Sequence, residues 1–260
     1  ADAARPFDMA YEFHDEAVKM KVVIMVSRFG HCLNDLLYRW RIGALPIDIV
    51  AVVSNHMDYQ KVVVNNDIPF HCIKVTPENK ADAEARIMAV VEDAGAELIV
   101  LARYMQILSD EQAAHFTGRC INIHHSFLPG FKGAKPYHQA HVRGVKMIGA
   151  TAHYVTTDLD EGPIIHQDVE PITHADSPEE LVRKGRDIER RVLAEAVRLH
   201  IEERVLLSET RTDETNLRES VHADLEAALG GLQGTRAGRR PDEITLTHEG
   251  VDTMKSRIGN

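Results

Sequence analysis

The feature that most constrains the fold of this chain is a regular alternation of two kinds of segment between residues 21 and 205. Short apolar runs have the length of buried strands, and the longer segments between them repeat their apolar residues at helical spacing. Strands that alternate with helices through short loops are joined by right-handed crossovers and form a mostly parallel sheet. The sequence therefore predicts an α/β fold in which helices flank a mostly parallel, twisted sheet.

The boundaries of the expected elements follow from the same pattern. Strands are expected at residues 22–26, 47–53, 70–75, 98–101, 120–124, 147–154 and 164–169. Helices are expected at residues 34–42, 81–93, 109–116, 137–143 and 178–205. The run Thr76-Pro77-Glu78 is typical of a helix start, because an N-cap residue precedes a proline in the first turn.

The character of the chain changes at both ends of this alternation. Residues 1–20 are mixed and amphipathic, with one strand expected near 7–13, and are too few to form a domain alone. Residues 208–260 are polar, with a helix expected at 216–229. We therefore expect a catalytic domain at 21–207, preceded by a remnant or linker and followed by a polar, partly disordered tail.

Length and composition limit the classes of function. The 260 residues, 44% of them hydrophobic, suit one large α/β domain with appendages. A formal net charge of −10 disfavours binding to nucleic acid or to an anionic membrane surface. No apolar run approaches the roughly 20 residues of a membrane span, and no signal-peptide pattern opens the chain. Three scattered cysteines indicate reduced thiols, so we expect a cytoplasmic protein.

Polar side chains on one face of the strand expected at 120–124 indicate a reaction site. Ile121 and Ile123 point to one face of this strand, so Asn122 and His124 point to the other. A core strand that carries an amide and an imidazole loses packing energy on that face. Because open α/β sheets bind ligands outside the carboxyl ends of their strands, we expect the site where this strand ends.

An acidic turn at residues 158–163 supplies a carboxylate, from Asp158 or Asp160, that completes a candidate catalytic set. An amide that donates to an oxyanion, an imidazole that moves a proton and a carboxylate are the groups that acyl transfer requires. Ser126 lacks the glycine pattern of a nucleophile elbow, and Cys120 lies inside the expected strand. Direct transfer to water or to an amine therefore fits better than a covalent intermediate.

The residues alone also allow structural explanations. Asn122 could brace the loop, His124 could be a satisfied core histidine, and Asp160 could serve only its turn. The pair His138-x-x-His141 lacks a third ligand, so we expect no metal site.

The first loop of the expected sheet gives a useful exclusion. A phosphate-binding loop needs several glycines, which let backbone N–H groups approach the anion. Residues 27–34 contain only Gly30, among bulky side chains. A nucleotide or a phosphorylated sugar is therefore disfavoured at the helix start that follows.

Several stretches of the chain resemble the folate-dependent formyltransferase family. They are residues 27–40, 54–56, 122–133, 133–140 and 158–165. The resemblance is nearly continuous from Phe7 to Leu207 and is closest to the members that hydrolyse 10-formyltetrahydrofolate. It implies a Rossmann-like formyltransferase fold, a place in one-carbon metabolism and purine biosynthesis, and release of formate and tetrahydrofolate with no cofactor beyond the folate substrate.

The resemblance also implies a role for each matching residue. Asn122 would donate a hydrogen bond to the formyl oxygen, His124 would transfer a proton, and Asp160 would orient the attacking water. Two segments would bind the folate pterin, with His153 beside them. The residues of these segments are Met105, Gln106, Ile107, Leu108, Val155, Thr156 and Thr157.

Two alternative functions stand beside hydrolysis. The glycinamide ribonucleotide transformylases of this family resemble the chain at the same three catalytic positions, but their first loop is glycine-rich. Arg28, Phe29 and His31 stand in that loop here, so water is the expected acceptor. The second alternative is an inactive folate-binding protein, because residues 1–20 resemble only a remnant of the family's N-terminal ACT-type domain and residues 208–260 have no match. Expected partners are the folate and water, with no nucleic acid and no membrane, and a homo-oligomer is left open.

Overall fold

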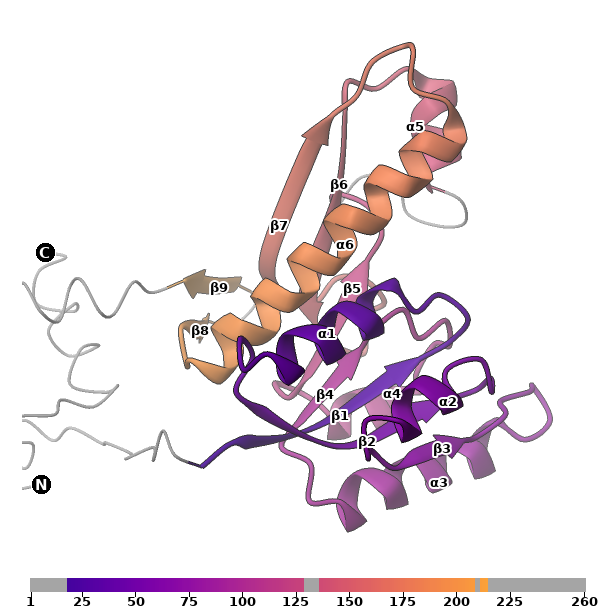
Figure 1. Cartoon of the computed structure of the whole chain (residues 1–260), viewed down its shortest axis with the longest axis vertical. Coiled ribbons are helices and arrows are strands. Elements are labelled where there is room, and N and C mark those ends of the chain that lie inside the picture. Colours follow the sequence, from indigo (N-terminus) through magenta and orange to yellow (C-terminus); the bar gives the residue numbers. More distant parts are fainter. Residues whose placement is uncertain (1–17, 129–135, 209–210, 215–260) are drawn as a thin grey trace, which may run out of the picture. The chain divides into compact units, whose positions relative to one another are not determined.

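The structure is a computed structural model that describes residues 18–128, 136–208 and 211–214 (Figure 1). The strand expected near 7–13 and the helix expected at 216–229 lie outside the described residues. The division of the chain into segments 1–20, 21–207 and 208–260 stays a prediction.

A seven-stranded sheet forms the centre of the described chain, with the strand order β3-β2-β1-β4-β5-β6-β7. The strands are β1 (Met20–Val26), β2 (Ile47–Ser54), β3 (Phe70–Cys72), β4 (Leu98–Leu101), β5 (Cys120–His124), β6 (Met147–Tyr154) and β7 (Ile164–Pro171). Strands β3, β2, β1, β4 and β5 pair in parallel, whereas β6 and β7 add an antiparallel edge. The expected mostly parallel α/β sheet is confirmed.

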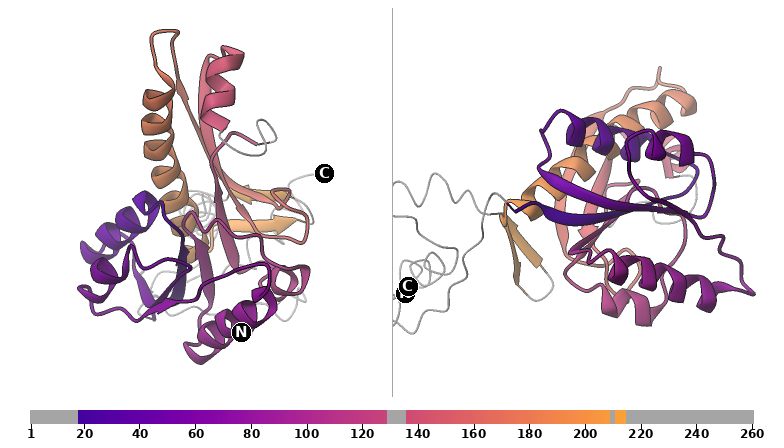
Figure 2. Two further views of the ribbon diagram at one scale, coloured as in Figure 1. Left: turned by 90° about the vertical axis from the view of Figure 1, so that its right-hand side faces the viewer. Right: turned by 60° about the horizontal axis from the view of Figure 1, so that its bottom comes forward.

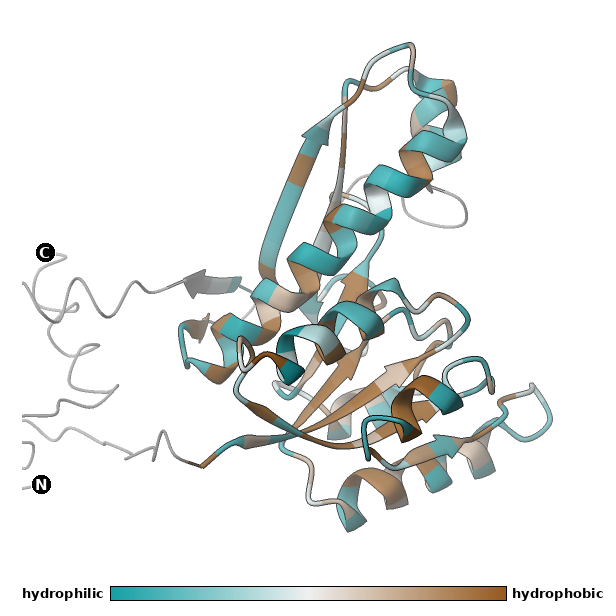
Figure 3. Ribbon diagram, viewed as in Figure 1, coloured by the Kyte–Doolittle hydropathy of each residue, from teal (hydrophilic) through white to brown (hydrophobic). Residues whose placement is uncertain are grey.

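Two layers of helices cover this sheet (Figure 2). Helices α1 (His31–Arg41) and α6 (Pro178–Ile201) pack on one face, and α3 (Lys80–Asp93) packs on the other. The remaining helices are α2 (Gln60–Val64), α4 (Asp110–His115) and α5 (Pro136–Arg143). Figure 3 shows the hydrophobic residues concentrated on the central strands, while the outer side of α6 is mainly hydrophilic.

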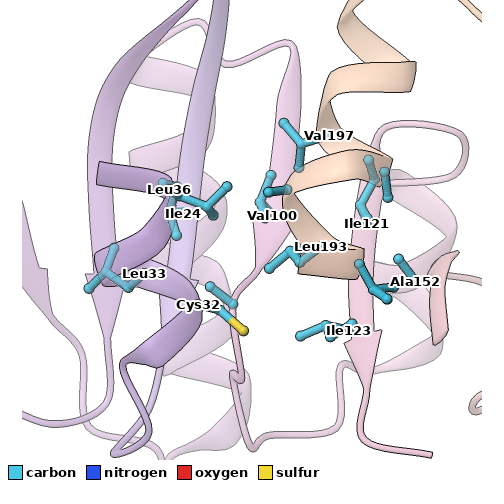
Figure 4. Close-up of a cluster of buried hydrophobic side chains, with 14 of the residues drawn as sticks. Ile24, Cys32, Leu33, Leu36, Val100, Ile121, Ile123, Ala152, Leu193 and Val197 are labelled. Atoms are coloured by element: carbon cyan, nitrogen blue, oxygen red, sulfur yellow. The ribbon is translucent and has the colours of Figure 1, made fainter. Parts of the chain in front are cut away.

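The core between the sheet and the first helix layer follows directly from the sequence periodicity. Ile24, Val100 and Ile121 project from three neighbouring strands, and Leu193 and Val197 of α6 pack over them (Figure 4). All five side chains are inaccessible to solvent. Truncating such a leucine to alanine typically costs 2–5 kcal/mol, so this layer contributes strongly to the free energy of unfolding.

Local sequence signals fix the residue at which helix α6 begins. The Ser177 hydroxyl accepts from the Glu180 amide, and the Glu180 carboxylate accepts from the Ser177 amide, which forms a capping box. Pro178 stands at the first helical position, where its missing N–H has no intrahelical partner to lose. The helix ends at Ile201 rather than at residue 205, because Glu203 turns the chain with a φ of 53°.

Other boundaries also differ from expectation, among them that of β3, which ends at Cys72 and not at residue 75. Helix α1 begins at His31, ahead of the apolar repeat that indicated residue 34. Helix α3 begins at Lys80, with Asn79 as its N-cap. The Asn79 side chain accepts from the Thr76 amide at 2.7 Å and donates to the Lys74 carbonyl at 3.0 Å. The Thr76-Pro77-Glu78 run is therefore held as a turn before the helix, and the expected helix start there is wrong.

The structure also contains elements that the sequence pattern did not predict. Helix α2 has only five residues. Strands β8 (Val205–Ser208) and β9 (Arg211–Glu214) form an antiparallel hairpin that continues past Leu207. The Thr212 hydroxyl donates to the Ile164 carbonyl, which ties this hairpin to the start of β7. Among the described residues, none of the helices combines the length and apolarity that a membrane crossing requires.

A pair formed by a tyrosine and a histidine joins the C-terminal end of α6 to the sheet, and it predicts how stability depends on pH. The Tyr154 hydroxyl and His200 Nδ1 lie 2.6 Å apart, and burial lowers the pKa of His200 to about 4 from its ordinary 6.5. The folded protein therefore keeps His200 neutral, while the unfolded chain binds a proton below pH 6.5. This contribution to stability is complete above pH 6.5 and is lost as the pH falls toward 4.

We predict that His200→Asn removes one proton from the acid dependence of stability. Between pH 6 and pH 4.5 the free energy of unfolding of the variant should fall less steeply than that of the wild type, by about 1.4 kcal/mol per pH unit. Tyr154→Phe should keep the wild-type slope, because burial and not the hydroxyl lowers this pKa. Chemical denaturation at several pH values measures both slopes, and equal slopes for wild type and His200→Asn would contradict the prediction.

Candidate active site

A cleft of about 740 Å³ opens at the carboxyl ends of β1, β4 and β5. Neighbouring β1 and β4 are the strands at which the strand order reverses, and such a switch point is where open α/β sheets bind ligands. The volume is that of a site for a small organic molecule. All the site residues expected from the sequence line this cleft. They are Met105, Gln106, Ile107, Leu108, Asn122, His124, His153, Val155, Thr156, Thr157 and Asp160.

Strand pairing brings the catalytic candidates together. Asn122 and His124 alternate along β5, and the antiparallel register places His153 of β6 opposite Asn122. Asn122 Nδ2 lies 3.2 Å from His153 Nε2. Asp160, on the connection from β6 to β7, places its Oδ1 3.2 Å from His124 Nδ1 and 3.8 Å from His153 Nε2. Three elements thus converge on one cluster of an amide, two imidazoles and a carboxylate.

The His153 ring fixes the orientation of the Asn122 amide. His153 Nδ1 lies 2.9 Å from the Tyr154 carbonyl, which can only accept, so Nδ1 carries the proton. Burial lowers the pKa of His153, which keeps the ring neutral and its Nε2 an acceptor. The Asn122 nitrogen therefore donates one hydrogen to His153 Nε2 and keeps its second hydrogen for a ligand.

Asp160 fixes the orientation of the His124 ring and the nitrogen that carries its proton. Its Nδ1 faces Asp160, and the hydrogen bond from His124 lowers the pKa of that carboxyl, which is therefore ionised at neutral pH. An ionised carboxylate accepts, so His124 carries its proton on Nδ1. Its Nε2 is buried and has no hydrogen-bond partner among the described residues. A buried nitrogen without a partner is destabilising, and this one belongs to a residue that lines the cleft.

The turn that carries Asp160 is under conformational constraint. Asp160 has a φ of 57°, which a non-glycine residue adopts only at a cost. A Cβ atom on Gly162 would lie 1.8 Å from the Tyr154 carbonyl oxygen, so only glycine fits there. The Tyr154 amide also donates to the Pro163 carbonyl at 2.9 Å. The turn is thus fixed against the end of β6, and Asp160 serves both the turn and the cluster.

Comparisons with known proteins identify the family of this chain. A family model described as formyl transferase matches residues 20–197. A formyltetrahydrofolate deformylase of Corynebacterium sp. strain P-1 is 53% identical over 212 residues, which cover 82% of this chain and 74% of the relative. The chain belongs to the formyltetrahydrofolate deformylase family.

Solved structures place the chain in the same family. The crystal structure of a formyltetrahydrofolate deformylase from Burkholderia mallei matches with a TM-score of 0.78 and 54% identity, over 83% of this chain and 76% of that one. Glycinamide ribonucleotide transformylase 1 from Symbiobacterium toebii matches with a TM-score of 0.71 and 28% identity, over 76% and 95% of the two chains. The expected formyltransferase fold is confirmed.

In this deformylase-family chain the segment Met105 to Leu108 is fixed at its start. The Met105 amide donates to the Ser27 hydroxyl at 2.9 Å, and that hydroxyl donates to Asn55 Oδ1 at 2.7 Å. The side chains of Met105 and Ile107 are exposed in the cleft although both are apolar. Apolar side chains displayed in a cleft on a fixed backbone are suited to an aromatic ligand.

A buried glutamate that the sequence pattern did not indicate also lines the cleft. Glu189 of α6 is only 1% exposed. Its Oε1 accepts from the Tyr137 hydroxyl at 2.7 Å, and its Oε2 lies 2.8 Å from His31 Nε2 and 3.3 Å from Arg103 Nε. Glutamate in an amphipathic helix usually faces solvent, so the sequence pattern did not predict that Glu189 is buried. The available signal was its position on the apolar stripe, three residues before the buried Val192.

This glutamate belongs to the one group of described residues with metal-ligand spacing. His31, Cys32 and Glu189 place their ligand atoms within 4.8 Å of one another. Arg103 already approaches the same Glu189 oxygen with its positive charge. Burial raises the pKa of Cys32, which keeps the thiol protonated, whereas a metal ligand must be a thiolate. The donor set therefore does not suit a metal ion.

We predict that Gly162→Ala displaces Asp160. The added methyl collides with backbone, which cannot move aside as a flexible side chain can, so the turn must shift. A crystal structure of the variant should show the His124 Nδ1–Asp160 Oδ1 distance beyond about 3.5 Å, outside hydrogen-bonding range. Gly144→Ala is the control, because Gly144 also tolerates alanine poorly at a φ of 68° but has nothing within 4 Å of its Cβ position. An unmoved Asp160 in the Gly162 variant would refute the constraint.

Proposed function

We propose that this protein hydrolyses 10-formyltetrahydrofolate to formate and tetrahydrofolate, with Asn122, His124 and Asp160 as the catalytic residues. The observation that carries the proposal is the His124–Asp160 pair beside the cleft, in which His124 Nε2 has no hydrogen-bond partner among the described residues. A neutral imidazole with one nitrogen held by a carboxylate and the other free is the arrangement that general base catalysis requires. Two similar relatives, from Corynebacterium sp. strain P-1 and Burkholderia mallei, are named formyltetrahydrofolate deformylase, which supports this activity.

In the first step, water attacks the carbonyl carbon of the N10-formyl group. His124 Nε2 takes a proton from the water as its oxygen bonds to carbon, and Asp160 stabilises the imidazolium that forms. The remaining lone pairs of the carboxylate orient the water. The formyl oxygen gains negative charge, and the free hydrogen of the Asn122 amide donates to it. A donor of this kind contributes about 3 kcal/mol to transition-state stabilisation.

In the second step, the tetrahedral intermediate collapses. The carbonyl re-forms, the bond between the formyl carbon and N10 breaks, and His124 returns its proton to N10. The oxygen and one hydrogen of water now belong to formic acid, which loses that proton to solvent, and the other hydrogen is on tetrahydrofolate. His124 and Asp160 end in their starting states. The reaction thus needs no cofactor beyond the folate itself.

The first loop supports water as the acceptor in place of a phosphorylated amine. Gly30 is the only glycine before α1, and a Cβ atom there would lie 2.1 Å from the Tyr59 ring. Tyr59 also donates its hydroxyl to the Arg28 carbonyl at 3.0 Å. Gly30, the one flexible position of the loop, thus packs against the Tyr59 ring. This ring covers the start of α1, where a phosphate would have to approach the backbone amides.

Within this proposal the pterin binds between the segment Met105 to Leu108 and the turn Val155 to Thr157, which face the same cleft.

The three cysteines are free thiols, which suits the cytoplasm. A nucleic-acid partner is not part of the proposal, and association into a homo-oligomer stays a prediction.

We predict that Asp160→Asn lowers the rate of formate release by two to four orders of magnitude, the usual contribution of a positioned acid–base pair. Because the pKa of Asp160 lies below its ordinary value, the wild-type carboxylate is ionised throughout weakly acidic and neutral pH. The loss of rate should therefore be present both at pH 6 and at pH 8. Asp158→Asn, an exposed change in the same turn, should keep the rate within about threefold. A formate-release assay with 10-formyltetrahydrofolate measures all three proteins, and an active Asp160 variant would remove the proposed role.

We predict that glycinamide ribonucleotide does not act as an acceptor. Its phosphate meets a loop that is filled by side chains, so its addition should neither accelerate consumption of 10-formyltetrahydrofolate nor yield a formylated product. Mass spectrometry of the reaction mixture, with formate quantified in parallel, makes the test. A formylated amine would favour the transferase alternative, whereas tight folate binding without formate would favour an inactive binding protein.

A further inference from the structure

We propose that Arg103 and Arg186 form a subsite for a small carboxylate in the cleft, where formate is held after hydrolysis. The inference rests on the proposed function for the origin of the formate. It rests on the structure for the subsite itself, which uses residues outside the Asn122, His124 and Asp160 cluster.

The backbone of Arg103 is strained in the same way as that of Asp160. Four non-glycine residues of the described chain have a positive φ, and only Arg103, at 64°, and Asp160, at 57°, line the cleft. The Arg103 carbonyl is held by the Ser27 amide at 3.2 Å. Strain of this kind costs free energy and persists where the surrounding structure enforces it, commonly at sites of function. Arg103 is therefore a candidate for a functional role on backbone geometry alone.

The guanidinium of Arg103 is buried, but its hydrogen-bonding capacity is largely unused. The residue is 9% exposed. Its only ion-pair partner among the described residues is Glu189, at 3.3 Å from Nε, and Nε makes no hydrogen bond of good geometry there. Glu189 meanwhile is hydrogen-bonded by Tyr137 and by His31. A structural ion pair would use the planar fork of arginine more completely. Glu189 instead offsets the charge of Arg103 and leaves its donors available to the cleft.

Arg186 brings a second guanidinium to the Phe29 ring. The Cζ atoms of Arg103 and Arg186 lie 5.8 Å and 5.6 Å from the centre of this ring. Arg186 is exposed and forms no ion pair among the described residues. Both arginines line the cleft, so their positive charges attract an anion that enters it. A carboxylate matches the donor geometry of arginine.

The subsite adjoins the reacting groups. The His125 ring lies 5.1 Å from the His124 ring and 6.4 Å from the Tyr137 ring, centre to centre. Burial first, and the charge of Arg103 second, lower the pKa of His125 to about 4, so this ring is neutral during turnover. Arg103 and His124 line the same cleft, so formate that leaves the catalytic cluster encounters the charge of Arg103.

Formate inhibition of the hydrolysis tests the proposal. We expect Arg186→Gln to weaken inhibition by sodium formate about tenfold, the loss that one charge-assisted hydrogen bond gives, with the KM for 10-formyltetrahydrofolate changed less than threefold. Arg183→Gln is the matched control, because Arg183 is exposed on the same helix but does not line the cleft. It should behave as the wild type. Sodium chloride at equal ionic strength corrects for screening.

A second pair of variants tests Arg103 without leaving a buried charge unpaired. Glu189→Gln alone should bind formate at least as tightly as the wild type, since the competing carboxylate is gone. Arg103→Gln combined with Glu189→Gln should bind it about tenfold more weakly than Glu189→Gln. This comparison keeps the same neutral residue at position 189 in both proteins, so a general loss of packing there cannot produce the difference.

Two outcomes would overturn the subsite. One is unchanged formate inhibition in both Arg186→Gln and the double variant. The other is a tenfold rise in the KM for the folate with formate inhibition unaffected, which would assign the arginines to the glutamate carboxylates of the folate tail. Labelling of arginine with phenylglyoxal tests binding without turnover. Protection of Arg186 by formate but not by chloride supports the subsite even if hydrolysis fails, and equal labelling in both salts refutes it.

Discussion

The register between β5 and β6 is the constraint on which the chemistry depends. Antiparallel pairing places Asn122 directly opposite His153 and His124 opposite Thr151. Because side chains alternate along a strand, a slip of one residue in either strand would turn the amide away from the imidazole. The apolar residues between them secure this register. Ile121 and Ile123 are buried under α6, so a slipped strand would expose them and bury polar side chains in their place.

The features of the site that lower stability lie together at the carboxyl ends of the central strands. They are a buried unpaired imidazole nitrogen, two strained backbones and a buried carboxylate. The opposite ends of the same strands lie in an apolar core that compensates for this loss. Such a division agrees with the positions of His124, the last residue of β5, and of Arg103, which follows β4.

The parts of the structure that the sequence predicted are those set by local pattern. The strands at the sheet centre were found because fully buried strands are continuous apolar runs, as in Val22 to Val26. Asn122 and His124 were recognised as unusual because they interrupt such a pattern. The convergence of Asp160 with them was expected from the family resemblance, since it depends on the β6–β7 turn. Glu189 and Arg103 were missed because their contacts join α6 to the loop after β4, and no local pattern contains that pairing.

Helix α6 links the stability of the fold to the environment of the reaction. Its buried stripe packs on the central strands through Leu193 and Val197, and one turn earlier the same stripe presents Glu189 to the cleft. Gly185 lies where a Cβ atom would be 2.1 Å from the Tyr137 ring, so the helix accepts a glycine to let the Tyr137 hydroxyl reach Glu189. A glycine within a helix costs about 1 kcal/mol relative to alanine. This glycine thus lowers the stability of the helix but lets it hold a carboxylate beside Arg103. The same packing that stabilises the sheet therefore fixes the environment of that arginine's charge.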